Sequence, residues 1–265
     1  MDKLVLLTDF GNQDGYAGVM RGVIGKINPQ ASVIDLSHEV PPQDIHAANF
    51  ILYTHYRYFP EGSIFVIVVD PEVGTKRRPL IVQTEHYFFV TPDNGSLSYL
   101  LSQEKPKKVI HVQNASFFLP RVSSSFHGRD VFSPVGAHLS LGRGLSEFGP
   151  SIPASDIISW PFPKVKKTRD GLKGCVLYID CFGNLITNIH EKDLSRLPKK
   201  FSVTVKEKFL GEGCRTYADR QPGEFLSFIA SGGLLEIAQN MGNAGRVLKA
   251  AVGDEVVVQV KRRKT

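Results

Sequence analysis

Two acidic residues stand where apolar runs of this sequence end. Asp70 follows residues 64–69, an unbroken apolar run that predicts a strand buried on both faces of a sheet. Asp9 follows a similar run at residues 4–8. Because open α/β sheets bind ligands at the carboxyl ends of their strands, we expect both carboxylates at a ligand site. There they could accept ribose hydroxyls or hold a metal ion, although each could also simply cap a turn.

A guanidinium and an imidazole are further candidates for chemistry in the first half of the chain. Pro71 and Gly74 end the strand and turn the chain, so that Arg77 comes shortly after Asp70. His127 stands beside a glycine, in a turn before an expected helix. An imidazole in such a place can act as a base, a donor or a ligand, or can bond only to a backbone carbonyl. Residues 129 and 130, an arginine and an aspartate, fit a local ion pair at the start of that helix.

Two stretches of the second half of the chain offer further binding residues. Residues 180–184 join two expected strands, and Phe182 there could stack on a base while Asp180 and Asn184 supply donors and acceptors. The same residues also suit an ordinary hairpin turn. Residues 231–238 contain two glycines that allow close backbone approach to a ligand, or an ordinary turn.

The order of the expected elements predicts two domains. In residues 1–155, strands at 4–8, 32–36, 64–69, 80–84, 87–90 and 108–112 are interleaved with helices at 16–27, 44–58, 96–101 and 131–141. This rhythm predicts an α/β domain whose mostly parallel sheet is flanked by helices. Residues 156–170 have the proline-rich composition of a linker. Residues 171–265 contain short strands separated by turn signals, which predict a smaller, all-β antiparallel barrel.

Composition sets limits on the class of protein. The chain has 265 residues and a net charge of +6, without an apolar run long enough to span a membrane. The first residues begin a strand pattern instead of a signal peptide, so we expect a cytoplasmic protein. Its three cysteines fit neither a disulfide framework nor a zinc site. The basic residues 261–264 are interpreted as a solvated end, because no nucleic-acid-binding signature accompanies them. No P-loop, nucleophile elbow or zinc-protease motif is present.

Five motifs, taken together, resemble those of a known family. They are TDFG at 8–11, DPxVGTxR at 70–77, FHGRD at 126–130, DxFGNxxTN at 180–188 and EIAxNxGNA at 236–244. Each is weak alone, but they cover nearly the whole chain in order and at the family's spacing. The chain thereby resembles the S-adenosyl-L-methionine hydroxide adenosyltransferases, which are relatives of the fluorinase and the chlorinase.

The resemblance implies an S-adenosyl-L-methionine hydrolase. Asp70, Arg77 and His127 would activate water to attack the 5′ carbon of the substrate, giving adenosine and L-methionine. The family's fold is an α/β domain followed by a β-barrel domain. Its members form trimers, with sites between the first domain of one subunit and the second domain of a neighbour. Neither a metal nor a cofactor other than the substrate is implied, and neither is a nucleic-acid or membrane partner.

The resemblance also assigns substrate-binding residues. Asp9 matches the acid that contacts both ribose hydroxyls, and Thr75 and Phe126 match positions around the ribose and the reacting carbon. The positions expected to bind the adenine or the methionine part are Asp180 (the amine), Phe182, Asn184, Ser231, Glu236 and Met241 (the adenine, through its backbone).

Five positions depart from the patterns of the fluorinases or of this family, and one of them is Ala230, which stands where an asparagine often precedes the serine. Fluorinases carry a tyrosine at the position of Asp70 and a serine at that of Gly128, so these two residues favour water over a halide as the nucleophile. Gln43 replaces a fluorinase tryptophan, and Glu72 replaces a glycine usual in its loop.

Two other classes of function are compatible with the residues alone. A metal-dependent nucleotidase or phosphohydrolase could use Asp9, Asp14, Asp70 and His127 as ligands, although Arg77 would oppose a nearby cation. A non-catalytic module could bind S-adenosylmethionine or another nucleoside without converting it.

Overall fold

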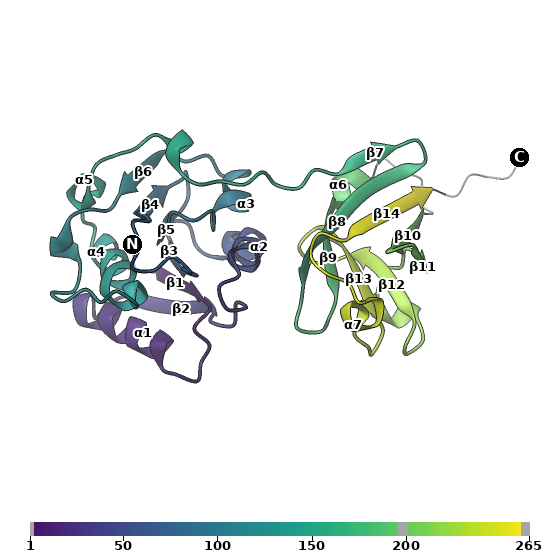
Figure 1. The fold of residues 1–265 in the computed structure, drawn as a ribbon, viewed down its shortest axis with the longest axis horizontal. Coiled ribbons are helices and arrows are strands. Elements are labelled where there is room, and N and C mark those ends of the chain that lie inside the picture. The colour runs from purple at the N-terminus through teal and green to yellow at the C-terminus, as the bar shows by residue number, and fades with distance from the viewer. Residues whose placement is uncertain (1–2, 196–200, 261–265) are drawn as a thin grey trace, which may run out of the picture. The chain divides into compact units, whose positions relative to one another are not determined.

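The computed structural model describes residues 3–195 and 201–260 of the chain. Two compact units make up the chain, one ending at Phe162 and the other beginning at Pro163 (Figure 1). The expected linker, residues 156–170, spans this division. Its first part packs on the first unit: the Ile158 N–H donates to Asp93 (2.8 Å), and the Trp160 ring stacks on His46. The exact bounds of the linker stay a prediction. No helix in the described part of the chain is long and apolar enough to cross a membrane.

A six-stranded sheet forms the centre of the first unit, in the order β2-β1-β3-β5-β4-β6. Strand β1 pairs in parallel with β2 and β3, and β3 pairs in parallel with β5. Only β4 runs against its neighbours, β5 and β6. This confirms the predicted mostly parallel sheet. The strands are β1 (Lys3–Thr8), β2 (Ser32–Ser37), β3 (Ile64–Val68), β4 (Pro79–Gln83), β5 (Phe88–Pro92) and β6 (Lys108–His111).

Helices cover both faces of this sheet, as Figure 1 shows, with α1 and α4 on one face and α2 and α3 on the other. Helix α1 buries Ala17, Met20 and Ile24, which share one face at helical spacing. The carboxylate of Asp44 caps α2 by accepting from the Ala47 N–H (2.9 Å), as its position in the sequence predicts. The helical elements are α1 (Tyr16–Ile27), α2 (Ile45–His55), η1 (Tyr56–Tyr58), α3 (Ser98–Leu101), η2 (Ala115–Phe117), η3 (Gly128–Phe132), α4 (Ser133–Ser140), α5 (Leu145–Phe148) and η4 (Ala154–Asp156).

The second unit is built on an eight-stranded antiparallel sheet. Its order is β11-β10-β14-β8-β9-β13-β12, and β7 pairs with β8. After β11 ends, the Cys214 N–H donates to the Ser227 carbonyl on β12 (2.7 Å), so the two outer strands approach and the sheet nearly closes. This confirms the predicted barrel-like, all-β second part. The strands are β7 (Lys166–Thr168), β8 (Gly171–Ile179), β9 (Leu185–His190), β10 (Phe201–Val205), β11 (Lys208–Glu212), β12 (Phe225–Ile229), β13 (Leu234–Gln239) and β14 (Glu255–Val260).

Short helices occupy three connections of this sheet, and their lengths explain why the sequence shows no helical periodicity there. A single turn or two is too short for a repeating apolar face. The elements are α6 (Glu191–Leu194), η5 (Tyr217–Asp219) and α7 (Ala244–Leu248).

Candidate active site

The predicted set of Asp70, Arg77 and His127 is one hydrogen-bonded cluster. The Arg77 Nε–H donates to both carboxylate oxygens of Asp70 (3.0 and 2.9 Å), and its Nη2 also donates to Oδ2. The same Nη2 lies 2.7 Å from Nδ1 of His127. The side chains of Asp70 and Arg77 are each only 4% exposed. The structure therefore brings together, largely away from solvent, an arginine and a histidine that are 50 positions apart, with Asp70 beside them.

The loop after β3 is shaped to hold this cluster. The Asn94 amide donates to the Val69 carbonyl (2.8 Å), which fixes the end of the strand. Gly74 then turns the chain at φ +79°, in the left-handed region that glycine adopts without strain. A Cβ on this glycine would overlap the Ser124 carbonyl. Glycine is thus needed for the loop that carries Arg77 to lie against the loop that leads to His127.

The segment around His127 is anchored by Asp130, which is fully buried. Asp130 accepts from the Arg129 Nε–H (2.6 Å) and from the Ser123 N–H (2.8 Å). Burial favours the neutral acid, but these two donors outweigh it and lower the pKa of Asp130. The pair Arg129–Asp130 is therefore the local ion pair that the sequence allowed. It lies within the π-helix η3, a kind of helical irregularity that is frequent at functional sites.

The contact with Arg77 defines the protonation state of His127. A guanidinium nitrogen can only donate, so Nδ1 of His127 must accept, and the proton of the neutral ring is then on Nε2. Burial lowers the pKa of His127 from its ordinary 6.5, and the charge of Arg77 lowers it further. The carboxylates of Asp70 and Asp130 and the Ser123 backbone oppose this shift without cancelling it. The imidazole is thus neutral at neutral pH.

The carboxyl ends of β1 and β3 border a cavity of about 250 Å³. Asp9, Asp70, Phe126 and His127 all line it, so the expected ribose-binding acid and one expected pocket aromatic lie beside the catalytic set. Asp9 accepts from the Gln43 N–H (2.7 Å). Burial raises the pKa of Asp9, and this N–H acts in the opposite direction. The other lining residues are Phe10, Pro42, Gln43, Val68, Pro71, Val73, Ser125 and Gly128.

Thr75 lies away from this cavity. It borders a different hollow of about 610 Å³, which Arg77 and Asp93 also line. Arg77 thus reaches the cluster with Asp70 and His127 from the side of this hollow. The Thr75 hydroxyl oxygen accepts from the Arg77 N–H (3.2 Å), so it supports the loop that carries the guanidinium. The predicted contact of Thr75 with the substrate stays a prediction.

In the second unit, three of the predicted binding residues are connected through Tyr217. The Asn184 amide donates to Asp180 (3.0 Å) and to the Tyr217 hydroxyl (3.1 Å), and this hydroxyl donates to Glu236 (2.7 Å). Burial raises the pKa of Glu236, and the nearby Asp180 adds to the effect, while the Tyr217 hydrogen bond lowers it. Sequence reasoning missed Tyr217. A single tyrosine in an irregular segment carries no local sign of a partner 19 residues away.

Phe182 and Met241 are apolar side chains exposed on neighbouring loops of the second unit. Their side chains are 72% and 87% exposed. The Gly245 N–H donates to the Gly183 carbonyl (2.8 Å), which holds the two loops together. Ser231 lies elsewhere, in the turn of the β12–β13 hairpin. Ile229 pairs with Leu235 beside this turn, whereas Phe225 pairs with Gln239 at the opposite end of the hairpin. The structure thus groups Phe182 with Met241 and not with Ser231.

Three of the four ligands of the phosphohydrolase hypothesis, Asp9, Asp70 and His127, line the same cavity, but they are not arranged as a metal site. No group of three or more His, Cys, Asp or Glu residues in the described part of the chain is arranged to hold a metal ion. In addition, both carboxylate oxygens of Asp70 accept from Arg77.

Comparison with known proteins identifies the family. Residues 4–149 match the SAM hydroxide adenosyltransferase N-terminal domain, and residues 174–257 match the C-terminal domain of the same name. The chain belongs to the SAM hydroxide adenosyltransferase family, as its motifs indicated.

Individual relatives are similar over nearly the full chain. The (R)-S-adenosyl-L-methionine hydrolase of Salinispora arenicola is 34% identical, and the match covers 95% of each chain. The enzyme of the same name from Methanocaldococcus jannaschii is 32% identical, covering 97% of this chain and 96% of the relative. A fluorinase of Actinoplanes is 25% identical over 89% of this chain and 90% of its own. The crystal structure of an uncharacterised conserved protein from Thermotoga maritima matches with a TM-score of 0.90 at 34% identity, over 97% of this chain and 100% of that one.

Proposed function

We propose that this protein is an S-adenosyl-L-methionine hydrolase that releases adenosine and L-methionine. The observation that carries the proposal is the buried cluster of Asp70, Arg77 and His127 at the edge of a cavity that Asp9 also lines. Family membership and relatives named as hydrolases over nearly the full chain support it.

The chemistry is an in-line displacement by water. A bond forms between the water oxygen and the 5′ carbon while the bond from that carbon to sulfur breaks, and its electron pair stays on sulfur. Methionine then leaves as a neutral thioether, so no general acid is needed, and the attacking water releases one proton to the solvent as the new bond forms. The task of the site is to place one water molecule behind the 5′ carbon.

The charges of the cluster suit a cationic substrate. Arg77 and Asp70 neutralise each other, and His127 is neutral, so the set does not repel a sulfonium. Since Nδ1 of His127 faces Arg77, the ring is arranged to donate from Nε2 instead of taking up a proton. We assign His127 to orienting the water, Arg77 to stabilising its developing hydroxide character, and Asp70 to holding Arg77 in place.

The remaining predicted residues would bind the rest of the substrate. Asp9 would accept the ribose hydroxyls, with Phe126 beside the sugar and Thr75 supporting the loop. The cavity of about 250 Å³ is small for a molecule of this size, which favours additional walls. Those walls would come from the second domain of a neighbouring subunit in a trimer, through Asp180, Phe182, Asn184, Ser231, Glu236 and Met241. The molar mass in solution, measured by light scattering, tests the trimer.

We further propose a cytoplasmic location and no metal or cofactor besides the substrate. The chain has only three cysteines, too few and too irregularly spaced for a disulfide framework, which suits a reducing compartment. The relatives are named for the (R) epimer at sulfur, and we extend that preference to this chain.

Incubation of the purified chain with the (R) and (S) epimers, each followed over time by chromatography, tests the proposal. We expect adenosine and methionine in equal amounts, formed faster from the (R) epimer. His127→Ala is expected to lower turnover about 10²-fold or more, because it removes the group that orients the water. His111→Ala, which alters a histidine on β6 away from the cavity, is the matched control and should keep wild-type turnover. Binding without adenosine release would instead favour the non-catalytic module.

A further inference from the structure

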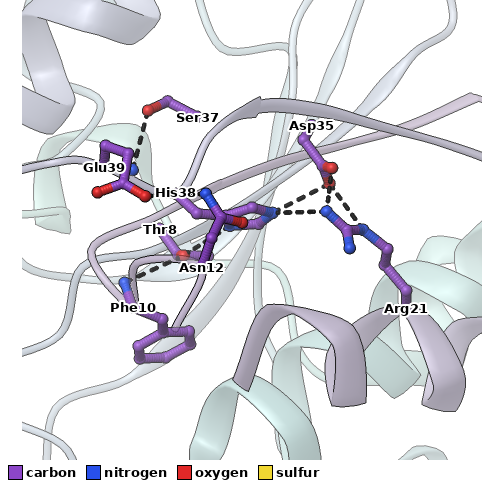
Figure 2. A network of polar contacts seen from close by, with 8 residues as sticks. All are labelled: Thr8, Phe10, Asn12, Arg21, Asp35, Ser37, His38 and Glu39. Carbon is purple, nitrogen blue, oxygen red and sulfur yellow. Dashed lines mark hydrogen bonds and ion pairs between the residues drawn. The ribbon is translucent and has the colours of Figure 1, made fainter. Parts of the chain in front are cut away.

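A buried histidine outside the cavity connects the surface of the first unit to the segment that carries Asp9 (Figure 2). His38 follows β2 and is only 3% exposed. Its Nδ1 lies 2.8 Å from the hydroxyl of Thr8, the residue immediately before Asp9. Its Nε2 lies 3.0 Å from Asp35, which also accepts from the Arg21 Nε–H (3.0 Å).

The partners of the ring give these hydrogen bonds a direction. Nε2 of His38 lies 3.0 Å from the Asp35 carboxylate, which only accepts, and 3.4 Å from Nη2 of Arg21, which only donates. Because the carboxylate is the nearer of the two, we place a proton on Nε2, which donates it to Asp35. In the neutral ring Nδ1 then accepts from the Thr8 hydroxyl, and the oxygen of that hydroxyl accepts from the Phe10 N–H (3.3 Å). An unbroken series of donors and acceptors thus runs from the backbone beside Asp9 to a partly exposed ion pair. Although partial burial favours its neutral form, the donors Arg21 and His38 lower the pKa of Asp35.

The same two segments are joined at several further points. The Gly11 N–H donates to the His38 carbonyl (2.7 Å), and the Asn12 amide donates to Glu39 (2.8 Å). The Gln43 N–H donates to the Asp9 carboxylate (2.7 Å). Gln43 adopts φ +64°, a left-handed conformation that is strained for a residue with a side chain. This strain occurs at the one residue of the loop whose N–H contacts Asp9, as expected where a loop is shaped for a ligand site.

The network ends on two residues that face the cavity. Phe10, whose N–H begins the series, lines the cavity and packs edge-to-face on Phe126, with ring centroids 5.4 Å apart. Asp9 lies between Thr8 and Phe10 and lines the same cavity. A histidine that only filled the core would not need to fix the chain on both sides of this carboxylate.

We propose that the series Thr8–His38–Asp35 is a positioning device that holds Asp9 and Phe10 where the ribose hydroxyls bind. None of its three members contacts the substrate; they act through the chain that carries Asp9. The inference rests on the proposed function, because it takes the ribose of the substrate or product as the ligand.

The test compares two ligands on the same protein. Binding of adenosine and of 2′,3′-dideoxyadenosine is measured by calorimetry, and their affinity ratio reports the contact with the hydroxyls. For the wild type we expect a ratio of about tenfold or more, as for a hydroxyl bound by a charged acceptor. Thr8→Val keeps the shape of the side chain but cannot donate to His38. It is expected to reduce the ratio at least about threefold, the equivalent of roughly one weak hydrogen bond.

Two control variants separate positioning from stability. Thr8→Ser restores the hydroxyl and should restore the ratio. Thr84→Val removes the hydroxyl of another buried threonine, which bonds the Tyr87 backbone at the opposite end of the same sheet. It should lower the unfolding midpoint about as much as Thr8→Val does while leaving the ratio unchanged. The ratio does not depend on the fraction of folded protein, since both ligands are measured on one preparation.

Any of three results would overturn the proposal. They are an unchanged affinity ratio in Thr8→Val, an equal reduction of that ratio in Thr84→Val, and a wild type that binds the two nucleosides equally well. If Thr8→Val does not fold, His38→Leu removes the acceptor from the other side and must reduce the ratio in the same way. The proposed function is tested separately by adenosine release from S-adenosylmethionine. Wild-type turnover combined with an unchanged ratio refutes only the positioning role, whereas absent turnover refutes the hydrolase.

Discussion

Nη2 of Arg77 lies 2.7 Å from Nδ1 of His127 while also donating to Asp70. This contact requires a neutral imidazole, because a protonated ring would place two cations against each other in a buried site. It also occupies the nitrogen of His127 that would otherwise be available to take up a proton. The relationship between these two residues therefore determines both the pH range of the enzyme and the role of the histidine.

Turnover is expected to decrease on the acid side with an apparent pKa below 6.5, the ordinary value for histidine. Burial and the charge of Arg77 lower the pKa of His127, so the ring becomes protonated only at a pH under that value. Stability should change in the same direction. The neutral ring makes its full contribution to the free energy of unfolding at a pH above 6.5, and this contribution is lost as the pH falls through the lowered pKa of His127. The pH profile of kcat measures this. His127→Gln, although much slower, should lack this acid limb, and a wild-type midpoint above 6.5 would contradict the account.

Replacing Arg77 by lysine should lower turnover by about 10²-fold, although the charge is kept. Lysine cannot reproduce the two-pronged geometry with which Arg77 contacts Asp70 and His127 at once. Arg78→Lys is the matched control, because Arg78 forms the analogous pair with the buried Asp93 (2.8 Å) beside the other hollow. Steady-state kinetics on both variants decide the matter. Similar losses in the two would mean that the guanidinium of Arg77 has only a structural role.

Gly74→Ala should destabilise the protein more than Gly62→Ala does. Both glycines have φ near +80°, so each substitution carries the backbone strain of about 1 kcal/mol expected for that region. A Cβ at position 62 would meet no atom nearby, whereas one at position 74 would overlap the Ser124 carbonyl. Overpacking there should add about 1–3 kcal/mol and separate the Arg77 loop from His127. Urea unfolding measures the difference, and equal losses of stability would show that the two loops are not in close contact.

Excess EDTA should leave turnover unchanged. The carboxylate of Asp70 is bound by Arg77, whose charge would oppose a metal ion at the same place. The assay is adenosine release before and after chelation and gel filtration. A loss of activity that Mg²⁺, Mn²⁺ or Zn²⁺ restores would instead support the phosphohydrolase alternative.

Local patterns in the sequence were sufficient to predict the strands that position the first half of the site. The apolar run before Asp70 is β3, fully buried as expected, and the spacing of residues 16–27 gives α1 with the same bounds. Because parallel strands end at a common edge, Asp9 and Asp70 could be placed together without coordinates. Arg77 and His127 were assigned to the same site because of the family's motifs, and not because of periodicity.

Long-range polar contacts could not be predicted in this way. His38 and Thr8 are 30 residues apart, and neither has a pattern that distinguishes it from other residues near strand ends. Tyr217 lies in a segment without periodicity, and its partner Glu236 is on an otherwise apolar strand. Which polar groups meet depends on how loops fold onto one another, and that is decided by tertiary packing instead of local preference.

The central claim, that water attacks the 5′ carbon directly, is tested most directly with ¹⁸O-labelled water. The chain is incubated with S-adenosylmethionine in that solvent, and the adenosine formed is analysed by mass spectrometry with fragmentation of the ribose. We predict one ¹⁸O atom per adenosine, on the 5′ oxygen. Adenosine without the label at that position, or no adenosine at all, would contradict the account.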